Sequence, residues 1–168
     1  MSKTLCKNCK NFFRRVLKVF AVERLQAYTP EDAAGIGRLR PILSEGKSDD
    51  PVPEQHLRAI IESPTSEQFV ARLDDSRRII GAATLTILFG ALSERKAWLN
   101  DFVTDPAASV RGIGRALWQE MGQWRIENDV DMTFTSHLGR TAAHNFYQKQ
   151  GAEIRDTTVF VKHFRTSE

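Results

Sequence analysis

The 168-residue chain contains no apolar run close to the roughly 20 residues that a membrane-spanning helix needs. Its first residues are charged and lack the continuous apolar core of a secretory signal. We therefore expect a cytoplasmic protein with no stable insertion into a membrane. The composition, with 41% hydrophobic and 27% charged residues, is that of a globular domain, and the length is sufficient to bury a core.

Cysteine is scarce, and the two that are present, Cys6 and Cys9, lie together in the run Cys-Lys-Asn-Cys. A structural zinc site needs a second pair of ligands, and no further cysteine supplies it. The four histidines are scattered without the spacing of metal ligands. A redox pair is normally found at the start of a helix in a packed fold. The sequence therefore predicts neither a metal site nor a redox function.

Acidic residues are absent from positions 1–18, which hold six of the 24 basic residues of the chain. The remainder has 18 basic against 21 acidic residues, so the formal charge of +3 falls to about −3 without this segment. The positive charge thus belongs to a basic N-terminal tail at 1–18 and not to a nucleic-acid-binding face of the domain at 19–168. The tail's apolar residues allow weak binding to an anionic surface, although a poorly ordered leader is the simpler interpretation.

Strand-like and helix-like segments follow one another in the order of an α+β domain. Periodicity, turn residues and caps predict strands at 19–22, 68–73, 78–89, 97–104, 132–136 and 157–164, and helices at 29–43, 54–61, 111–128 and 140–149. Short connections make the strands between 68 and 104 antiparallel. The helix at 111–128 carries a stripe of Ile113, Leu117, Met121 and Trp124, and its crossover makes the strand at 132–136 parallel to the one at 97–104.

Gly112 and Gly114 open this long helix, directly after a strand and a short loop that contains Pro106. Backbone N–H groups and the positive end of the helix dipole then converge on one point, which favours a phosphate or pyrophosphate. A Walker loop is excluded at this helix start because Gly114 is followed by Arg115-Ala116 and not by Lys-Ser/Thr. A dinucleotide-binding fold is excluded because its glycine-rich turn would follow the first strand and not the fourth.

Two segments resemble the GNAT superfamily of N-acetyltransferases. The run from Ser109 to Gly114 matches the family's pyrophosphate loop, Gln/Arg-x-x-Gly-x-Gly/Ala, except for serine at the first position. The run from Arg140 to Tyr147, with Gly151 four residues later, matches the family's second element, a small or polar residue followed by x-x-Ala-x-x-Phe-Tyr. The order of elements extends the resemblance over about 19–164, and the resemblance is specific from Ala97 onward.

The resemblance implies the GNAT acyltransferase fold, a three-layer α+β arrangement of a mixed, mostly antiparallel sheet with helices on both faces. It also implies transfer of the acetyl group of acetyl-CoA to a primary amine, by direct attack through a tetrahedral intermediate, with a homodimer as a further possibility. The expected cofactor-binding residues are Phe102, Val103, Thr104, Val110, Arg111, Gly112, Ile113, Gly114, Arg115, Arg140 and Phe146. If the strands at 97–104 and 132–136 splay, main-chain groups between them would bind the pantetheine arm and polarise the thioester carbonyl.

The resemblance places Tyr147 as the general acid that protonates the departing thiolate. The general base has several candidates. Some family members carry Glu-Asp on the fourth strand, where this chain has Asn100-Asp101. Asp101 is one candidate for the catalytic base, and His137, His144 and a chain of water molecules are the alternatives.

Strand alternation decides which of these side chains faces the substrate. In an unbroken strand, Asn100, Phe102 and Thr104 share one face, and Leu99, Asp101 and Val103 share the other. If the face of Asn100 meets the substrate, Asp101 is a structural residue.

The acceptor amine is expected to contact residues 33–66, which form the first two helices and the nearby loops. This region carries both signs of charge, on Arg38, Arg40, Arg58, Glu45, Asp49, Asp50, Glu54 and Glu62. Its acids would attract a cationic amine, although mixed charge on exposed helices commonly serves solubility. Family analogy favours a small-molecule amine over a protein lysine or N-terminus. The alternative function, motivated by Asn100 and Ser109, is a catalytically silent module that binds CoA or a partner protein.

Overall fold

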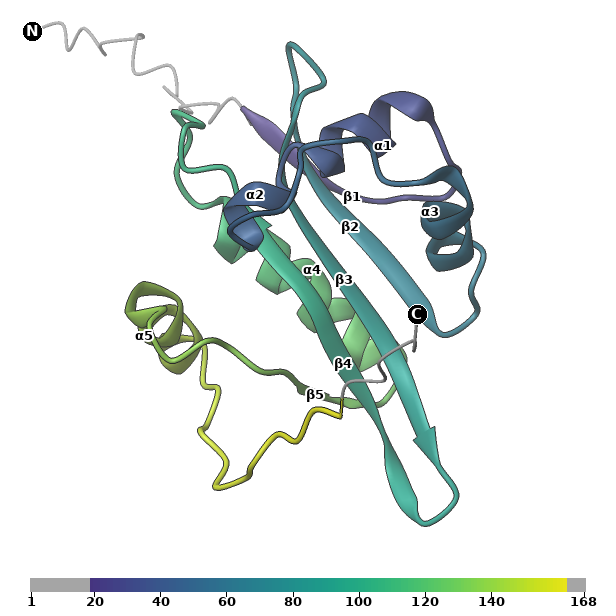
Figure 1. Ribbon diagram of the computed structural model, residues 1–168, viewed down its shortest axis with the longest axis vertical. Helices are drawn as coiled ribbons and strands as arrows, with labels where there is room; N and C mark the ends of the chain where they lie inside the picture. Colours follow the sequence, from purple (N-terminus) through teal and green to yellow (C-terminus); the bar gives the residue numbers. More distant parts are fainter. Residues whose placement is uncertain (1–18, 163–168) are drawn as a thin grey trace, which may run out of the picture. The chain divides into compact units, whose positions relative to one another are not determined.

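The structure is a computed structural model that describes residues 19–162 as two compact units, divided between Phe134 and Thr135 (Figure 1). The basic segment at 1–18, with Cys6 and Cys9, lies outside the described residues. None of the helices within 19–162 combines the length and apolar character that crossing a membrane requires. The same residues contain no group of three or more His, Cys, Asp or Glu side chains placed to hold a metal ion.

The first unit is built on a five-stranded mixed sheet. Its strands are β1 (Phe20–Arg24), β2 (Ser66–Leu73), β3 (Ile79–Gly90), β4 (Ser93–Thr104) and β5 (Asp131–Thr133), and they lie side by side in that order. The first four are antiparallel, and β5 is parallel to β4 because α4 (Ile113–Glu127) carries the chain across between them. The predicted antiparallel strands and the parallel crossover are confirmed.

The first helical segment differs from the prediction of one helix over 29–43. The structure has α1 (Pro30–Gly37) followed by a separate short helix, α2 (Arg40–Leu43). The break has a local cause: Pro41 has no N–H to donate to the preceding turn, and its ring clashes with the carbonyl four residues earlier. The next helix, α3 (Glu54–Ile61), has the predicted bounds.

Helix α4 covers one face of the sheet through the predicted stripe, since Ile113, Leu117, Met121 and Trp124 are all buried in the larger core cluster. The helix approaches closely at Gly81 of β3. A Cβ atom at that glycine would lie 2.9 Å from Ile113 Cγ2 and 3.0 Å from Leu117 Cδ1. The absence of a side chain at position 81 therefore sets how near the start of α4 lies to the sheet.

The opposite face of the sheet carries a second core cluster, formed with α1 to α3. Its members are Leu25, Leu39, Val70, Ile79, Ala82 and Val103, with Ile36, Leu43 and Ile61 packed against them. The loop between α2 and α3 returns to α1, where Val52 N–H donates to Ala33 O at 3.0 Å. A Cβ atom on Gly37 would collide with the backbone of Asp50, so a glycine is needed where this loop crosses the end of α1.

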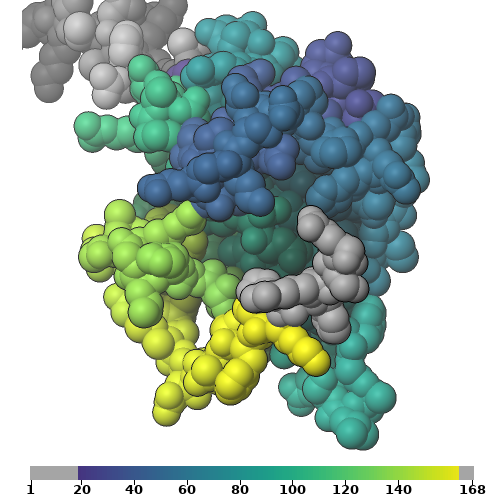
Figure 2. Space-filling view, in the orientation of Figure 1, coloured from purple at the N-terminus to yellow at the C-terminus, as the bar shows by residue number. Residues whose placement is uncertain are grey.

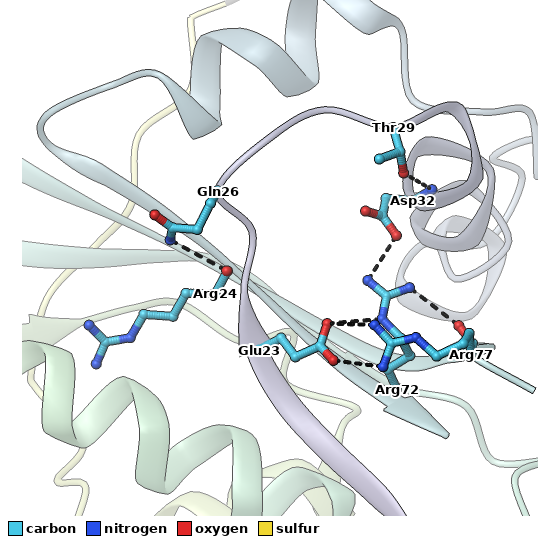
Figure 3. Close-up of polar contacts among 7 residues, drawn as sticks. All are labelled: Glu23, Arg24, Gln26, Thr29, Asp32, Arg72 and Arg77. Atoms are coloured by element: carbon cyan, nitrogen blue, oxygen red, sulfur yellow. Dashed lines mark hydrogen bonds and ion pairs between the residues drawn. The ribbon is translucent and has the colours of Figure 1, made fainter. Parts of the chain in front are cut away.

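Arg72 ties α1 to the sheet through a nearly buried set of polar contacts (Figure 3). Its guanidinium binds Asp32 at 2.8 Å and Glu23 at 3.1 Å, and it also donates to the carbonyl of Arg77 at 3.2 Å. Burial alone would raise the pKa of Glu23, but hydrogen bonds from Arg77 and Arg72 outweigh it, and the pKa lies below its usual value of 4.5. The cap of α1 is adjacent, with Thr29 Oγ1 accepting from Asp32 N–H at 3.1 Å.

The second unit contains α5 (Thr141–Lys149), close to the predicted span, and the chain leaves it through Gly151 at a φ of +83°. The predicted strand at 157–164 is wrong as far as the structure describes it. Residues 157–162 form no strand, and Val159, Phe160 and Val161 are exposed. Alternating apolar residues make a strand only where a neighbouring strand takes up their backbone hydrogen bonds, and β1 to β5 do not pair with this segment.

Candidate active site

Asp105 turns the chain out of β4 and into the loop before α4. Its N–H donates to Ile80 O at 2.8 Å, and its Oδ1 accepts from Ala107 N–H at 2.8 Å. Arg78 lies 3.6 Å from the second carboxylate oxygen. These contacts anchor the first half of the predicted phosphate-binding loop to β3 and set the direction in which it leaves the sheet.

Gly112 caps the start of α4 in the left-handed conformation, with φ of +88°. The first helical bond of this turn joins Ala116 N–H to Gly112 O at 3.0 Å, so the N–H groups of Ile113, Gly114 and Arg115 precede the helical ladder. A Cβ atom at Gly112 would meet nothing within 4 Å, so the space beside this backbone is open. The arrangement suits an anion, because these amides and the helix dipole act together.

Other residues predicted at this loop divide between the core and the surface. Ile113 is buried, Val110 packs against the core, and Arg111 and Arg115 are exposed. Ile113 and the partly buried Val110 hold the loop against the core, while the two arginines leave their charge at the surface next to the helix start.

Strands β4 and β5 pair over only a short stretch, which joins Lys96, Ala97 and Trp98 to Asp131, Met132 and Thr133. Beyond it β4 continues to Thr104 paired with β3 alone. The Trp118 ring of α4 makes edge-to-face contacts with Phe102 of β4 at 6.0 Å and with Phe134, just after β5, at 5.9 Å between ring centroids. The pairing of β4 with β5 thus ends at Trp98 and Thr133, while the splay of the two strands stays a prediction.

A β-bulge at Asn100 reverses the expected alternation of β4. The pairing with β3 passes from Thr84 opposite Asp101 to Leu85 opposite Leu99, so Asn100 is an extra residue on β4. The prediction that Leu99 shares a face with Asp101 is therefore wrong. Leu99 and Phe102 both pack in the core beneath α4, whereas Asp101 and Val103 line a cavity on the other face.

Asp101 is held by two polar side chains that sequence reasoning missed. Thr84 Oγ1 lies 3.3 Å from Asp101 Oδ2 and 3.0 Å from Gln68 Oε1. The Gln68 amide nitrogen donates to Ala83 O and Phe69 O, both at 3.1 Å, which leaves Oε1 as the acceptor. Both Thr84 and Gln68 are buried. The sequence contained one indication of these contacts, a glutamine and a threonine within strands that are otherwise mostly apolar.

We call the hollow above this carboxylate the Asp101 cavity. It has a volume of about 290 Å³, and its lining residues are Ile36, Leu39, Arg40, Leu43, Ser44, Lys47, Val52, Pro53, His56, Leu57, Ile60, Gln68, Ala82, Thr84, Asp101 and Val103. Figure 2 shows the teal atoms of β3 and β4 recessed below the blue atoms of the α2 region. The predicted acceptor region therefore does form a wall of a cavity, but its acids Glu45, Asp49, Asp50, Glu54 and Glu62 are not among the lining residues.

The remaining predicted site residues belong to the second unit and are described within it. Arg140 is the N-cap residue of α5, and the rings of Phe146 and Tyr147 make an edge-to-face contact at 5.7 Å. Burial raises the pKa of the Tyr147 phenol above its usual value of 10, although the charge of Arg140 acts in the opposite direction. Of the alternative bases, His137 uses Nδ1 to accept from Gly139 N–H at 3.1 Å, a turn-capping contact.

A mixed sheet with a glycine-capped helix start between β4 and β5 agrees with the GNAT acyltransferase fold that the sequence resemblance implies. The sequence profile of the acetyltransferase (GNAT) family matches residues 36–152, and the chain belongs to this family. It is accordingly an acetyl-CoA-dependent N-acetyltransferase. No curated protein sequence matches the chain.

Solved structures share this fold. An aminoglycoside acetyltransferase from an uncultured soil metagenomic sample, solved with sisomicin, is 20% identical, with a TM-score of 0.70 over 88% of this chain and 97% of that one. The aminoglycoside acetyltransferase AAC(6')-Iy, solved with a CoA bisubstrate analogue, is 18% identical, with a TM-score of 0.68 over 87% and 99%. An acetyltransferase of Trypanosoma brucei is 18% identical, with a TM-score of 0.69 over 86% and 99%. At these identities the likeness establishes the fold.

Proposed function

We propose that the protein acetylates the primary amine of a small molecule bound in the Asp101 cavity, with Asp101 as general base and Tyr147 as general acid. The observation that carries this proposal is the carboxylate of Asp101, which lines an otherwise mostly apolar cavity and is supported by Thr84. An amine bound there meets a proton acceptor, and the apolar walls enclose the rest of a small molecule.

The loop before α4 fits the pyrophosphate of acetyl-CoA. The amides of the first turn of α4 precede the helical ladder, and the backbone at Gly112 is open on its outer side. Arg111 and Arg115 are exposed next to these amides and supply positive charge, which compensates for Ser109 at the position where the family usually has glutamine or arginine. When bound, acetyl-CoA supplies an acetyl thioester whose carbonyl carbon is open to attack.

The route of the proton follows from the contacts of Thr84. The hydroxyl has one proton and two neighbouring acceptors, Gln68 Oε1 and Asp101 Oδ2. When Asp101 takes the proton of the attacking amine, its new O–H donates to Thr84 Oγ1, and the threonine proton turns to Gln68 Oε1. Protonation of Asp101 therefore supplies a hydrogen to both contacts of Thr84, whereas with ionised Asp101 the single hydroxyl proton serves one acceptor at a time.

Bond formation and cleavage balance in one transfer. The amine nitrogen attacks the thioester carbonyl carbon and forms the C–N bond of a tetrahedral intermediate, while Asp101 takes a proton from the nitrogen. The intermediate then collapses, the C–S bond breaks, and the sulfur receives a proton from the Tyr147 phenol. Asp101 afterwards releases its proton to solvent and the tyrosine phenolate takes one up, so both groups return to their starting state. A raised pKa keeps this phenol protonated at neutral pH, as a general acid requires. The assignment of Tyr147 to the sulfur rests on its match to the family's second element.

Replacing Asp101 with Asn tests the proposal, because the amide preserves shape and removes the basic oxygen. We expect turnover, measured as release of the CoA thiol with a panel of small amines, to fall about 100-fold or more. Acetyl-CoA binding, measured by calorimetry, should stay within about twofold, since Asp101 lies outside the phosphate-binding loop. Turnover equal to that of the parent protein would exclude Asp101 as the base.

The silent CoA-binding or protein-interaction module is the second candidate function. This alternative was suggested partly by the amide of Asn100, which stands where some family members have a glutamate. In the structure, Asn100 is the bulged residue, and its side chain donates to Thr86 Oγ1 at 2.9 Å. An acid at that position is therefore not needed to bring a carboxylate into the cavity. Acetyl-CoA binding without turnover of any amine in the same assay would favour this alternative.

A further inference from the structure

The Asp101 cavity carries charges of both signs on different elements. Among the described residues, Asp101 on β4 is the one carboxylate that lines it, whereas Arg40 of α2 and Lys47 of the following loop are cationic. The acids of this region are engaged elsewhere or lie outside the cavity: Glu54 and Glu62, for example, flank Arg58 on α3 at 2.8 and 3.5 Å. The cavity therefore presents a carboxylate from the sheet and cations from the helical wall.

The charges of Arg40 and Lys47 are not neutralised by protein carboxylates. Among residues 19–162, neither forms an ion pair. Arg40 Nη1 donates to the main-chain carbonyl of Asp50 at 3.4 Å, a weak contact with a neutral acceptor that orients the guanidinium and leaves its charge available. Cations that line a cavity without a protein counter-ion are suited to an anionic group of a ligand.

Most of the uncharged lining of the cavity is apolar, with Ser44, His56, Gln68 and Thr84 as its polar members. Leu39, Leu43, Val52, Leu57, Ile60, Ala82 and Val103 contribute to it. The volume of about 290 Å³ lies near the lower limit of the range of ligand pockets, about 300–1,000 Å³. A small molecule with a short hydrocarbon body fits this volume and these walls better than a large one.

We propose that the acceptor is a small monoamine with an anionic group, a carboxylate or a phosphonate-type group, at the other end of a short apolar body. The amine meets Asp101, and the anion meets Arg40 and Lys47. This inference rests on the proposed function and adds the class of substrate to it. The same arrangement opposes polycations, because only one ammonium group can meet Asp101 and the others would lie near two cations that no carboxylate of residues 19–162 neutralises.

A matched series of amines tests this class. It comprises ω-aminocarboxylates with two to five methylene groups, 3-aminopropylphosphonate, the corresponding alkylamines, the corresponding diamines and sisomicin. We expect the aminocarboxylates or the phosphonate to have kcat/KM at least about 10-fold above the alkylamines and the polycations. Comparison of the aminocarboxylates with the phosphonate shows whether the anionic group of the substrate is a carboxylate or contains phosphorus. Preference for diamines, alkylamines or sisomicin would overturn the proposal.

Charge-reversal variants test whether Arg40 and Lys47 cause the preference for anionic amines. Lys47→Glu changes an exposed side chain and is expected to raise KM for the preferred anionic amine about 10-fold, with kcat nearly unchanged. Arg40→Glu should act in the same direction. Arg38→Glu is the matched control, since Arg38 is exposed close to Arg40 but does not line the cavity. An equal effect from the control would show that only the overall charge matters and would overturn the assignment.

Binding measurements separate this inference from the proposed function. Calorimetry of the parent protein with each amine, in the presence of CoA, reports the charge preference without requiring turnover. If no amine is acetylated while the anionic amines still bind more tightly than the diamines, the proposed function fails and the ligand class stands. If amines are acetylated but the diamines bind and react best, the proposed function stands and the ligand class fails.

Discussion

Thr84 Oγ1 lies 3.3 Å from Asp101 Oδ2, on the neighbouring strand and directly opposite it in the pairing of β3 with β4. This contact joins a buried hydroxyl to an exposed carboxylate in the cavity. It makes Thr84 a positioning residue for the proposed base, and its contribution is separable from that of Asp101.

Replacing Thr84 with Val removes the hydroxyl and keeps the shape of the side chain. We expect kcat to fall about 10-fold, while KM for the amine and the affinity for acetyl-CoA stay within about twofold. Thr84→Ser restores the hydroxyl and should return most of the rate, which a loss of packing alone would not do. A rate unchanged in Thr84→Val would show that Asp101 acts without this contact.

Gly112 adopts φ of +88° and has open space beside it. Gly112→Asp strains the backbone and adds a negative charge at the start of α4, so acetyl-CoA affinity measured by calorimetry should fall more than about 10-fold. Gly112→Ala, which adds backbone strain of about 1–2 kcal/mol without the charge, should weaken binding less. Gly122 lies inside the same helix, also with open space beside it, and Gly122→Ala should leave the affinity unchanged. Equal affinities of the parent and Gly112→Asp would remove this loop as the binding site.

The raised pKa of Tyr147 leads to a prediction about pH. Burial raises this pKa above 10, so the phenol keeps its proton, and the acid remains functional, across pH 7 to 9. Tyr147→Phe should lower kcat about 100-fold, with acetyl-CoA affinity nearly unchanged. In the parent protein, kcat limited by this step should not decline with rising pH until above about pH 10. A decline between pH 7 and 9, abolished in Tyr147→Phe, would contradict the direction of the shift.

Arg72 is expected to contribute to the stability of the fold and not to the reaction. Arg72→Met leaves Asp32 nearly buried without its cation, and we expect the free energy of unfolding to fall by about 2–4 kcal/mol, less than for a fully buried pair because Glu23 is partly exposed. Chemical denaturation measures the change. Arg58→Met, which breaks exposed pairs on α3, is the control and should shift the midpoint little.

The pH dependence of this contribution has a defined sign. The pKa of Glu23 is lower in the folded protein than its usual value of 4.5, so its pairing stabilises the fold above that value. The stability is lost as the pH falls below 4.5 and through the folded-state pKa. Arg72→Met should therefore flatten the dependence of unfolding free energy on pH in this acidic range, and an unchanged slope would show that Arg77 alone holds the shift.

Local features of the sequence were sufficient for much of the fold. The stripe on α4 was predictable because a period of 3.6 residues depends only on the helix itself. The position of Gly112 at the start of a helix was predictable in the same way, because it comes directly after a strand and a short loop. The antiparallel strands were predictable from the short turns between them. The division of the first helix was also locally encoded, in Pro41, although the prediction passed over it.

The contacts of Asp101 were not predictable in this way. Gln68, Thr84 and Asp101 lie on three strands, and one bulge at Asn100 decides which face Asp101 takes. A shift of one residue in register moves a side chain to the other side of a sheet, and periodicity does not locate such a shift. The predicted strand at 157–164 failed for a related reason, since a strand depends on its partner.

By itself, the sequence determined the order of elements from α3 to α5, the buried face of α4 and the family, because each depends on neighbours along the chain or on motifs of a few residues. Tertiary structure alone decided that Asp101 faces the cavity, that Thr84 and Gln68 support it, and that Arg40 and Lys47 line the same cavity with no counter-ion among residues 19–162. Those properties arise from pairings and packing between segments distant in sequence, where the energy of a contact depends on register and on which face is buried.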